Sequence, residues 1–326
     1  MNSTAEAEPF DAIIIGGGAA GLSAAQSLGR ALRRTLILDA GEPRNRFAAQ
    51  MHNILGHDGA SPAELLAAGR AEAQRYGVEH LTAGVHRVSD STRADSTDKT
   101  GPRELVVTLD SGVQLFTRTV IAASGVTDVL PPIPGLAENW GSSVLHCPYC
   151  HGWEVRGRRL AVLATSPMQL HQAQLLRQWS DRLTYFHAGA GELTAETAAR
   201  LRARGVVLEP TPVTEVLGDG THVTGVVLQD SRTVEVDAIF TGGSLAPRDG
   251  YLRDLRLERE DTVVGSFLKV DAAGQTSHER IWAAGNIASP MATVPVSTGM
   301  GSFAGAAANG ALVMEEFDLA EAGKNQ

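Results

Sequence analysis

The chain has 326 residues, of which 43% are hydrophobic and 20% charged, and its formal net charge at pH 7 is −9. This composition is that of a globular protein, and the length favours about two domains. The negative balance argues against nucleic acid and against an anionic membrane surface as partners. No apolar run approaches the ~18 residues that a membrane-spanning helix needs.

The first ten residues and the number of cysteines indicate the cellular compartment of the protein. Residues 1–10 (MNSTAEAEPF) are polar and acidic, without the charged and apolar regions of a signal peptide. Two cysteines in so long a chain do not form the disulfide framework of a secreted domain. We therefore expect a cytoplasmic protein.

A dinucleotide fingerprint follows the first predicted strand. Residues 11–15 (DAIII) are typical of a buried parallel strand, residues 16–21 (GGGAAG) of a tight turn, and the Ala- and Leu-rich stretch to residue 32 of a helix. Gly16 would make the bend, Gly18 would let a pyrophosphate approach, and Gly21 would let helix and strand pack closely. A second strand over residues 35–38 ends at Asp39, which can hold a ribose hydroxyl. This order of elements favours a dinucleotide site over a plain glycine-rich turn.

The next stretch combines a long polar loop, one helix and several short strands. Residues 41–60 form a loop that is either functional or a plain solvated connection. A helix over residues 62–76 begins with a capping box made by Ser61 and Glu64. Short alternating strands follow from residue 85 to 120, interrupted by a polar tract over 89–104 that is typical of a mobile hairpin tip. A buried strand over residues 120–123 then leads to Ser124 and Gly125.

Residues 146–151 (HCPYCH) contain both cysteines, Cys147 and Cys150. A Cys-x-x-Cys pair can close a short disulfide, and the surroundings of such pairs usually lower the pKa of the first thiol. A zinc site would need further ligands, for which only His146 or His151 is near. A c-type haem would need export, and a passive buried pair fits poorly with the polar and aromatic neighbours. The motif therefore favours redox chemistry.

The chain after the cysteines repeats the strand–helix–strand pattern, with strands over 160–163 and 183–186 and a helix over 168–179. Its fingerprint is broken, because Ala164, Thr165, Ser166 and Pro167 stand where glycines should lie. Side chains there would block a pyrophosphate, and proline lacks an N–H donor. We expect a scaffold without a nicotinamide site, with weak binding through a displaced geometry as the alternative.

The last third returns to the first domain. Residues 238–243 close the second domain, and a strand over residues 280–286 ends in Gly285 and Asn286. A helix over residues 298–312 is rich in small residues that permit close backbone approach. Its N-terminal dipole could face the anionic edge of a reduced flavin.

The order GGGAAG, a Ser-Gly strand end, CPYC and AAGN resembles the low-molecular-weight thioredoxin reductase group of flavoproteins, over nearly the whole chain. Within that group, CPYCH and the loop EPRNRFAAQMHNILGHDG are most similar to FAD-dependent dithiol oxidases that install disulfides in natural products such as gliotoxin, holomycin and romidepsin. The resemblance implies an α/β fold with two Rossmann-like, three-layer ββα domains. These are an FAD domain over 1–127 and 244–326, and an inserted NAD(P)H-domain-like scaffold over 128–243 that carries the cysteines.

The resemblance also implies roles for individual residues. Cys150 would lie on the flavin side, and Cys147 would exchange with substrate. His151 stands where the reductases have Asp, which replaces an acid by a base that suits an oxidase, helped by His146. A capping role for His151 is the alternative. The FAD contacts would come from Gly16, Gly18, Ala20, Gly21, Asp39, Arg46, His52, Asn53, Val85, Ser124, Gly125, Gly285, Asn286 and Pro295. Asn286 replaces a reductase Asp, and Val294-Pro295 replaces an Arg-Gln pair.

The predicted function is oxidation of a small-molecule dithiol to a cyclic disulfide. Electrons would pass through Cys147 and Cys150 to FAD and then to molecular oxygen, giving hydrogen peroxide; no metal is expected, and relatives imply a homodimer. One alternative is a disulfide reductase fed by NAD(P)H or ferredoxin. Another is a non-catalytic flavoprotein that senses redox state.

Overall fold

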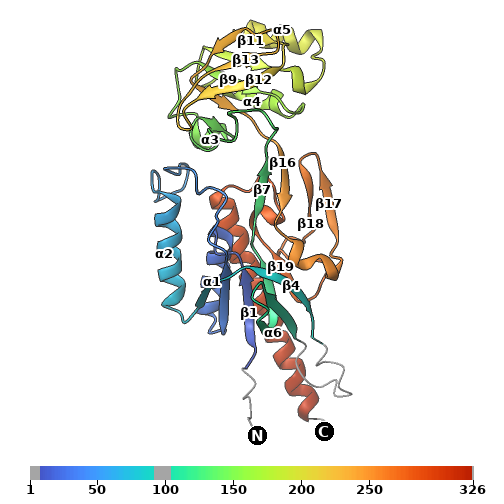
Figure 1. Cartoon of the computed structure of the whole chain (residues 1–326). Coiled ribbons are helices and arrows are strands. Elements are labelled where there is room, and N and C mark those ends of the chain that lie inside the picture. Colours follow the sequence, from blue (N-terminus) through green and yellow to red (C-terminus); the bar gives the residue numbers. More distant parts are fainter. Residues whose placement is uncertain (1–7, 92–103, 325–326) are drawn as a thin grey trace. The chain divides into compact units, whose positions relative to one another are not determined.

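The computed structural model describes residues 8–91 and 104–324, which form two compact units (Figure 1). The first unit comprises Met1–Arg44, Ala63–Thr127 and Leu245–Gln326, and the second comprises Asn45–Pro62 and Asp128–Ser244. The predicted division placed residues 45–62 in the first domain, whereas the structure groups them with the second unit. The polar first residues and most of the predicted hairpin tip lie outside the described residues.

The first unit is built on a seven-stranded sheet of order β3-β2-β1-β6-β5-β4, with β19 also paired to β6. Pairing is parallel among β1, β2, β3, β6 and β19, and antiparallel along β4-β5-β6. The strands are β1 (Phe10–Ile15), β2 (Thr35–Asp39), β3 (Glu79–Thr82), β4 (Val85–Asp90), β5 (Leu105–Leu109), β6 (Gln114–Ala122) and β19 (Ile281–Ala283). The strand predicted over 120–123 is thus the end of β6.

The sheet is covered on both faces, which makes three layers. Ile13 and Ile15 of β1 pack with β4, β5 and the short helix η3 (Gly250–Leu255), while Ala12 and Ile14 pack with α1 (Ala19–Arg30) and α6 (Val294–Lys324). This alternation explains why residues 12–15 of β1 are all apolar. The first unit also holds α2 (Pro62–Gln74), η4 (Gly285–Ile287) and the hairpin β17 (Arg259–Thr262) with β18 (Gly265–Leu268).

The helix predicted over residues 298–312 is wrong in both its bounds. Helix α6 begins at Val294 and ends at Lys324. Proline is tolerated in the first turn of a helix because its missing N–H would have no partner there, so Pro295 does not delay the start. A Cβ added to Gly301 would lie 2.0 Å from the Ala20 carbonyl oxygen of α1, so this glycine is required by close helix packing and does not end the helix.

The second unit repeats the three layers on a smaller scale. Its five-stranded parallel sheet has the order β11-β10-β9-β15-β8, with α4 and α5 on one face and the antiparallel sheet β12-β13-β14 on the other. The strands are β8 (Val144–Leu145), β9 (Leu160–Leu163), β10 (Leu183–Phe186), β11 (Val207–Glu209), β12 (Val213–Gly218), β13 (Val223–Leu228), β14 (Thr233–Glu235) and β15 (Ala238–Phe240). The helices are α3 (Pro148–His151), α4 (Gln169–Leu176), η2 (Ala188–Ala190) and α5 (Ala195–Ala203).

The two units are joined through a pair of strands, β7 (Val126–Val129) and β16 (Ser244–Pro247), which form a two-stranded sheet of their own. Both ββα units agree with the predicted fold class of two Rossmann-like domains. Among the described residues, no helix combines the length and the apolar character that crossing a bilayer requires.

An ion-pair network fixes α6 to the sheet of the first unit. Arg118 of β6 lies 3.0 Å from Asp11 of β1, 2.9 Å from Glu315 and 2.8 Å from Glu316. The hydrogen bond from Arg33, followed by that from Arg118, lowers the pKa of Glu316 to about 2. Burial alone would raise the pKa of Glu315, but Arg280 and Arg118 lower it overall. Glu315 and Glu316 are therefore ionised at neutral pH.

We expect this network to stabilise the fold only above acidic pH. A carboxyl whose folded pKa is depressed contributes stability above its unfolded pKa, and that contribution is lost as pH falls through the folded value. For Glu316 the window runs from an ordinary pKa of 4.5 down to about 2. Urea unfolding should show Glu316→Gln less stable than the wild type at pH 7, with the gap narrowing below pH ~4.5. Glu321→Gln, an exposed change on the same helix, is the control, and a gap independent of pH would contradict the prediction.

Candidate active site

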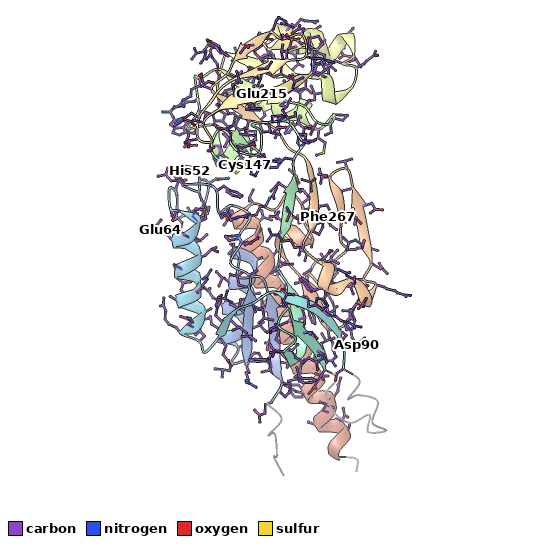
Figure 2. The ribbon with its side chains drawn as sticks, viewed as in Figure 1. His52, Glu64, Asp90, Cys147, Glu215 and Phe267 are labelled. Carbon is purple, nitrogen blue, oxygen red and sulfur yellow. A yellow bond between two sulfur atoms is a disulfide. The ribbon has the colours of Figure 1, made fainter. Side chains whose placement is uncertain are left out.

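The two cysteines are joined by a disulfide at the start of helix α3, with Cα atoms 5.3 Å apart. Figure 2 shows Cys147 in the second unit, next to the short helix α3 of Figure 1. Cys147 is the N-cap residue, Pro148 follows at the first helical position, and the Cys150 N–H donates to the Cys147 sulfur at 3.2 Å. After reduction, this N–H would favour negative charge on the Cys147 sulfur.

Aromatic packing holds α3 against the scaffold. The Tyr149 ring meets the Trp179 ring edge-on, with 5.8 Å between centroids, and a Cβ added to Gly152 would lie 2.9 Å from the Trp179 indole. Gly152 therefore allows the turn after α3 to lie directly on Trp179. Because Trp179 lies three residues after the end of helix α4, this packing connects the cysteine motif to the α4 segment.

His151, directly after Cys150, is partly buried, and because its pKa is lowered its imidazole is mainly uncharged at neutral pH. Burial is the main cause that lowers the pKa of His151, the Glu154 carboxylate opposes this effect, and His52 and His146 add to it. A neutral imidazole can accept a proton from a thiol, which is the role expected of His151.

His146 is held by the ends of two neighbouring strands and by helix α4. Its Nδ1 lies 3.3 Å from the carbonyl oxygen of Thr241, directly after β15, and its own carbonyl oxygen accepts from Gln172 Nε2 at 2.7 Å. Because a carbonyl only accepts, Nδ1 carries the proton, and Nε2 is the basic nitrogen in neutral His146.

The second βα turn, which follows β9, is closed by a side chain of its own domain. Gln169 is buried, and its Oε1 accepts from the Ser166 N–H at 2.9 Å, from the Thr165 N–H at 3.3 Å and from the Ser166 hydroxyl at 3.0 Å. On the other side, a Cβ added to Gly189 would lie 2.2 Å from the Ala164 carbonyl oxygen. The donors that a nucleotide phosphate would use are therefore already paired within the protein.

The first βα turn is different. The N-cap of α1 is Gly18, no side chain caps this helix, and a Cβ built on Gly18 would meet nothing within 4 Å. At Gly21, by contrast, a Cβ would lie 1.9 Å from the Gly16 carbonyl oxygen, so helix and strand touch there. Open N–H groups at a helix start, with bare backbone in front of them, fit the pyrophosphate of a dinucleotide such as FAD.

The turn after β6 is tied down by Arg248, which the sequence did not indicate. Ser124 Oγ donates to the Arg248 carbonyl oxygen at 2.7 Å and lies 3.0 Å from the Tyr251 hydroxyl. The Arg248 side chain in turn donates to Thr127 Oγ1 at 2.9 Å and to the Glu42 carbonyl oxygen at 3.3 Å. The expected Ser124-Gly125 turn is thus fixed to the segment after β16.

Asn286 and Asp39 each make contacts within the protein. Asn286 Nδ2 lies 3.0–3.1 Å from the carbonyl oxygens of residues 289, 290 and 292, which share its two N–H donors, and Oδ1 is the atom of this amide that could accept from a ligand. Asp39 ends β2 with its Oδ2 3.5 Å from Arg70 Nη2 of helix α2. Arg70 was absent from the predicted site, because nothing in its helical sequence context indicates that it faces Asp39.

The predicted residues divide between the two units. The first unit holds Gly16, Gly18, Ala20, Gly21, Asp39, Val85, Ser124, Gly125, Gly285, Asn286 and Pro295, and the second holds Arg46, His52, Asn53, His146, Cys147, Cys150 and His151. Within the first group, Ala20 and Gly285 are adjacent, since a Cβ on Gly285 would lie 3.1 Å from the Ala20 Cβ. Within the second group, His52, His146 and His151 are close enough to interact electrostatically. Their contacts with FAD stay predictions.

The sequence analysis missed three side chains of the second unit that the structure places at the cysteine motif. Gln169 and Gln172 lie three residues apart on α4, and Glu154 lies on the turn after α3. The spacing of the two glutamines puts them on one face of the helix, which is the signal that could have identified them. Among the described residues, no group of three or more His, Cys, Asp or Glu side chains is arranged to hold a metal ion.

Comparison with known proteins gives relatives that align over nearly their whole length. The thioredoxin reductase tcpT of Claviceps purpurea is 33% identical over 94% of this chain and 95% of its own. The thioredoxin reductase sirT of Leptosphaeria maculans is 31% identical over 91% of this chain and 93% of its own. Among solved structures, the crystal structure of HlmI has a TM-score of 0.88 and 40% identity, covering 99% of this chain and 98% of that chain.

The family model that describes pyridine nucleotide-disulphide oxidoreductases matches residues 10–301, which include both βα turns and the cysteine pair. By this match and by its full-length relatives, the chain belongs to the pyridine nucleotide-disulphide oxidoreductase family and, within it, to the proteins of thioredoxin reductase type.

Proposed function

We propose that the protein is an FAD-dependent dithiol oxidase, which closes an intramolecular disulfide in a small-molecule dithiol with oxygen as the final acceptor. The observation that carries this proposal is the contrast between the two βα turns. The turn before α1 presents open backbone and uncapped N–H groups, whereas Gln169 pairs the N–H groups of Thr165 and Ser166 in the second turn. One nucleotide can therefore be held, and a second, nicotinamide-bearing one has lost its phosphate donors.

The cysteine pair would take electrons from the substrate by thiol–disulfide exchange. A substrate thiolate attacks Cys147, forms a mixed disulfide and releases Cys150 as a thiolate. The second substrate thiol then displaces Cys147, so that the substrate leaves as a cyclic disulfide and both cysteines are reduced. His151 would take the proton of the attacking thiol and return it to Cys150, because a partly buried, neutral imidazole sits next to that sulfur in the chain.

The reduced pair then needs an acceptor for two electrons. Bound FAD would supply that acceptor and pass the electrons to oxygen, which becomes hydrogen peroxide. The residues suited to hold it are Gly16, Gly18 and Gly21 at the pyrophosphate and Asp39 at the ribose, with Asn286 Oδ1 as a further acceptor. The likeness to HlmI, at 40% identity over 99% of this chain, supports a shared fold for the two proteins.

A disulfide reductase is the second candidate, favoured by the names of the relatives tcpT and sirT, which are both thioredoxin reductases. In that case a pyridine nucleotide or another donor would reduce the flavin, and the cysteine pair would pass the electrons outward. The closed second turn argues against a pyridine nucleotide in this role.

Anaerobic reduction of the flavin separates the two functions. We expect dithiothreitol to bleach the yellow flavin, and admission of air to restore the colour with one hydrogen peroxide formed per flavin. NADPH should bleach it far more slowly, because its phosphates find no free donors in the second turn. Absorbance at the flavin band and a peroxide assay provide the readouts. Fast bleaching by NADPH would establish the reductase, and no response to either compound would contradict both functions.

Replacing either cysteine should abolish dithiol oxidation without removing the cofactor. Cys147→Ser and Cys150→Ser cannot close the disulfide, so turnover should fall by about 10³-fold or more. The flavin content should be unchanged, because both residues lie in the second unit and the dinucleotide fingerprint lies in the first. Ser142→Ala, an exposed change in the same unit, serves as the control. Turnover at the normal rate in Cys147→Ser would overturn the exchange chemistry.

Gln169 should stabilise the second unit through the hydrogen bonds that close the turn. Gln169→Ala leaves the Thr165 and Ser166 N–H groups without their acceptor, which should cost about 1–3 kcal/mol of unfolding free energy. Gln174→Ala, an exposed change on the same helix, should stay within about 0.5 kcal/mol. Urea unfolding followed by circular dichroism measures both. Equal stability of the two variants would show that Gln169 does not hold the turn.

A further inference from the structure

The loop that connects β2 to α2 is well packed, and its residues Asn45–Pro62 belong to the second unit. Met51 and Ile54 are buried, and the loop closes on itself through the Met51 N–H to the Ala60 carbonyl at 2.9 Å and the Gly59 N–H to the Met51 carbonyl at 2.8 Å. Figure 2 labels His52 on this loop. The position of His52 is therefore fixed by buried neighbours and backbone hydrogen bonds.

His52 lies between two carboxylates. Its Nδ1 is 3.4 Å from Asp58 Oδ1 within the loop, and its Nε2 is 3.5 Å from Glu154 Oε1, on the turn after α3. The exposed fraction of the side chains falls from 71% for Asp58 through 38% for Glu154 to 21% for His52. Asp58 also accepts from the Asn53 N–H at 3.1 Å, which fixes the carboxylate at the solvent side of His52.

Glu154 is also three residues after His151, which is the proposed base. The charged and titratable groups that act on His151 are Glu154, His52 and His146. Burial lowers the pKa of His151, the Glu154 carboxylate raises it, and positive charge on His52 or His146 lowers it. Glu154 therefore lies 3.5 Å from the His52 imidazole and also acts electrostatically on the His151 imidazole.

We propose that Glu154 and His52 are positioning residues that set the charge of His151 during dithiol oxidation, with Asp58 holding His52 in place. This proposal rests on the proposed function. In each cycle the proton of the attacking thiol moves to His151 and then to the Cys150 thiolate, so His151 must start neutral and be able to accept. The Glu154 carboxylate favours acceptance, and His52 limits that effect so that the imidazole does not stay protonated.

The proposal makes the two substitutions act in opposite directions. Glu154→Gln removes the negative charge, so the pH at which His151 loses its proton should fall. His52→Asn leaves Glu154 unpaired, so that pH should rise. Each shift should be about 0.5 pH unit, which is the size of a Coulomb interaction across about 6 Å when water screens the exposed Glu154 carboxylate, at a dielectric constant of about 80. If His52 acts through Glu154, His52→Asn should have a smaller effect in the Glu154→Gln background.

Two measurements on the full-length flavoprotein test this. Stopped-flow reduction of the flavin by dithiothreitol from pH 5 to 9 gives the pH range over which the reduction rate rises. The ionisation of dithiothreitol contributes equally for every variant, so it cancels when the variants are compared. Histidine NMR titration of the oxidised protein, assigned with His151→Gln, gives the His151 midpoint without turnover. Glu192→Gln, an exposed acid elsewhere in the unit, is the control for the loss of one negative charge, and matched melting temperatures exclude unfolding.

We expect the His151 midpoint to move to lower pH in Glu154→Gln and to higher pH in His52→Asn, both in the kinetics and by NMR. In Glu192→Gln the midpoint should stay at the wild-type value. The proposal is overturned if Glu154→Gln leaves the His151 midpoint in place, if both substitutions shift it in the same direction, or if the NMR midpoint moves while the kinetic limb does not. Failure of the wild type to be bleached by dithiothreitol contradicts the proposed function instead, and the NMR titration then still decides whether the pair controls His151.

Discussion

The N–H groups at the start of a helix that follows a parallel strand must be paired, and this chain satisfies them in two opposite ways. In the first unit the donors before α1 face bare backbone, so a ligand is the natural partner. In the second unit the Gln169 side chain reaches back to Thr165 and Ser166 and serves as that partner itself. In the proposed function, one copy of this architecture holds the dinucleotide, and the other copy is a scaffold that presents the cysteine pair.

The scaffold and the cysteine motif share their supports. Helix α4 carries Gln169, which closes the turn, and Gln172, which bonds the His146 carbonyl, and it leads into Trp179, which lies against the turn after α3. The α4 segment, which in a nucleotide-binding domain would lie at the phosphates, therefore supports the disulfide and His146 in this chain. In the proposed function, the residue that closes the second turn and the residues that support the cysteine motif therefore belong to the same helical segment.

Much of the fold could be read from the sequence because its signals are local. A few consecutive residues are enough to indicate a mostly apolar strand such as β1, a glycine-rich turn, or the loss of glycines in the second fingerprint. The extent of α6 was missed because its glycines read as interruptions, whereas Gly301 is a contact with Ala20 that only the folded chain reveals. At the site, Cys147 and His151 could be identified because they lie in one short motif. The contacts of Glu154 with His52 and of Arg248 with Ser124 join residues about one hundred or more positions apart, so the sequence did not indicate them.

The grouping of residues 45–62 with the second unit has a consequence for the freedom of the chain. One continuous inserted segment joins the rest of a chain at two points, and here these points lie in the paired strands β7 and β16. The loop adds two more, next to Arg44 and next to Ala63. The chain therefore passes between the units at four points, so any rearrangement of the units has to be accommodated by four stretches of backbone at once.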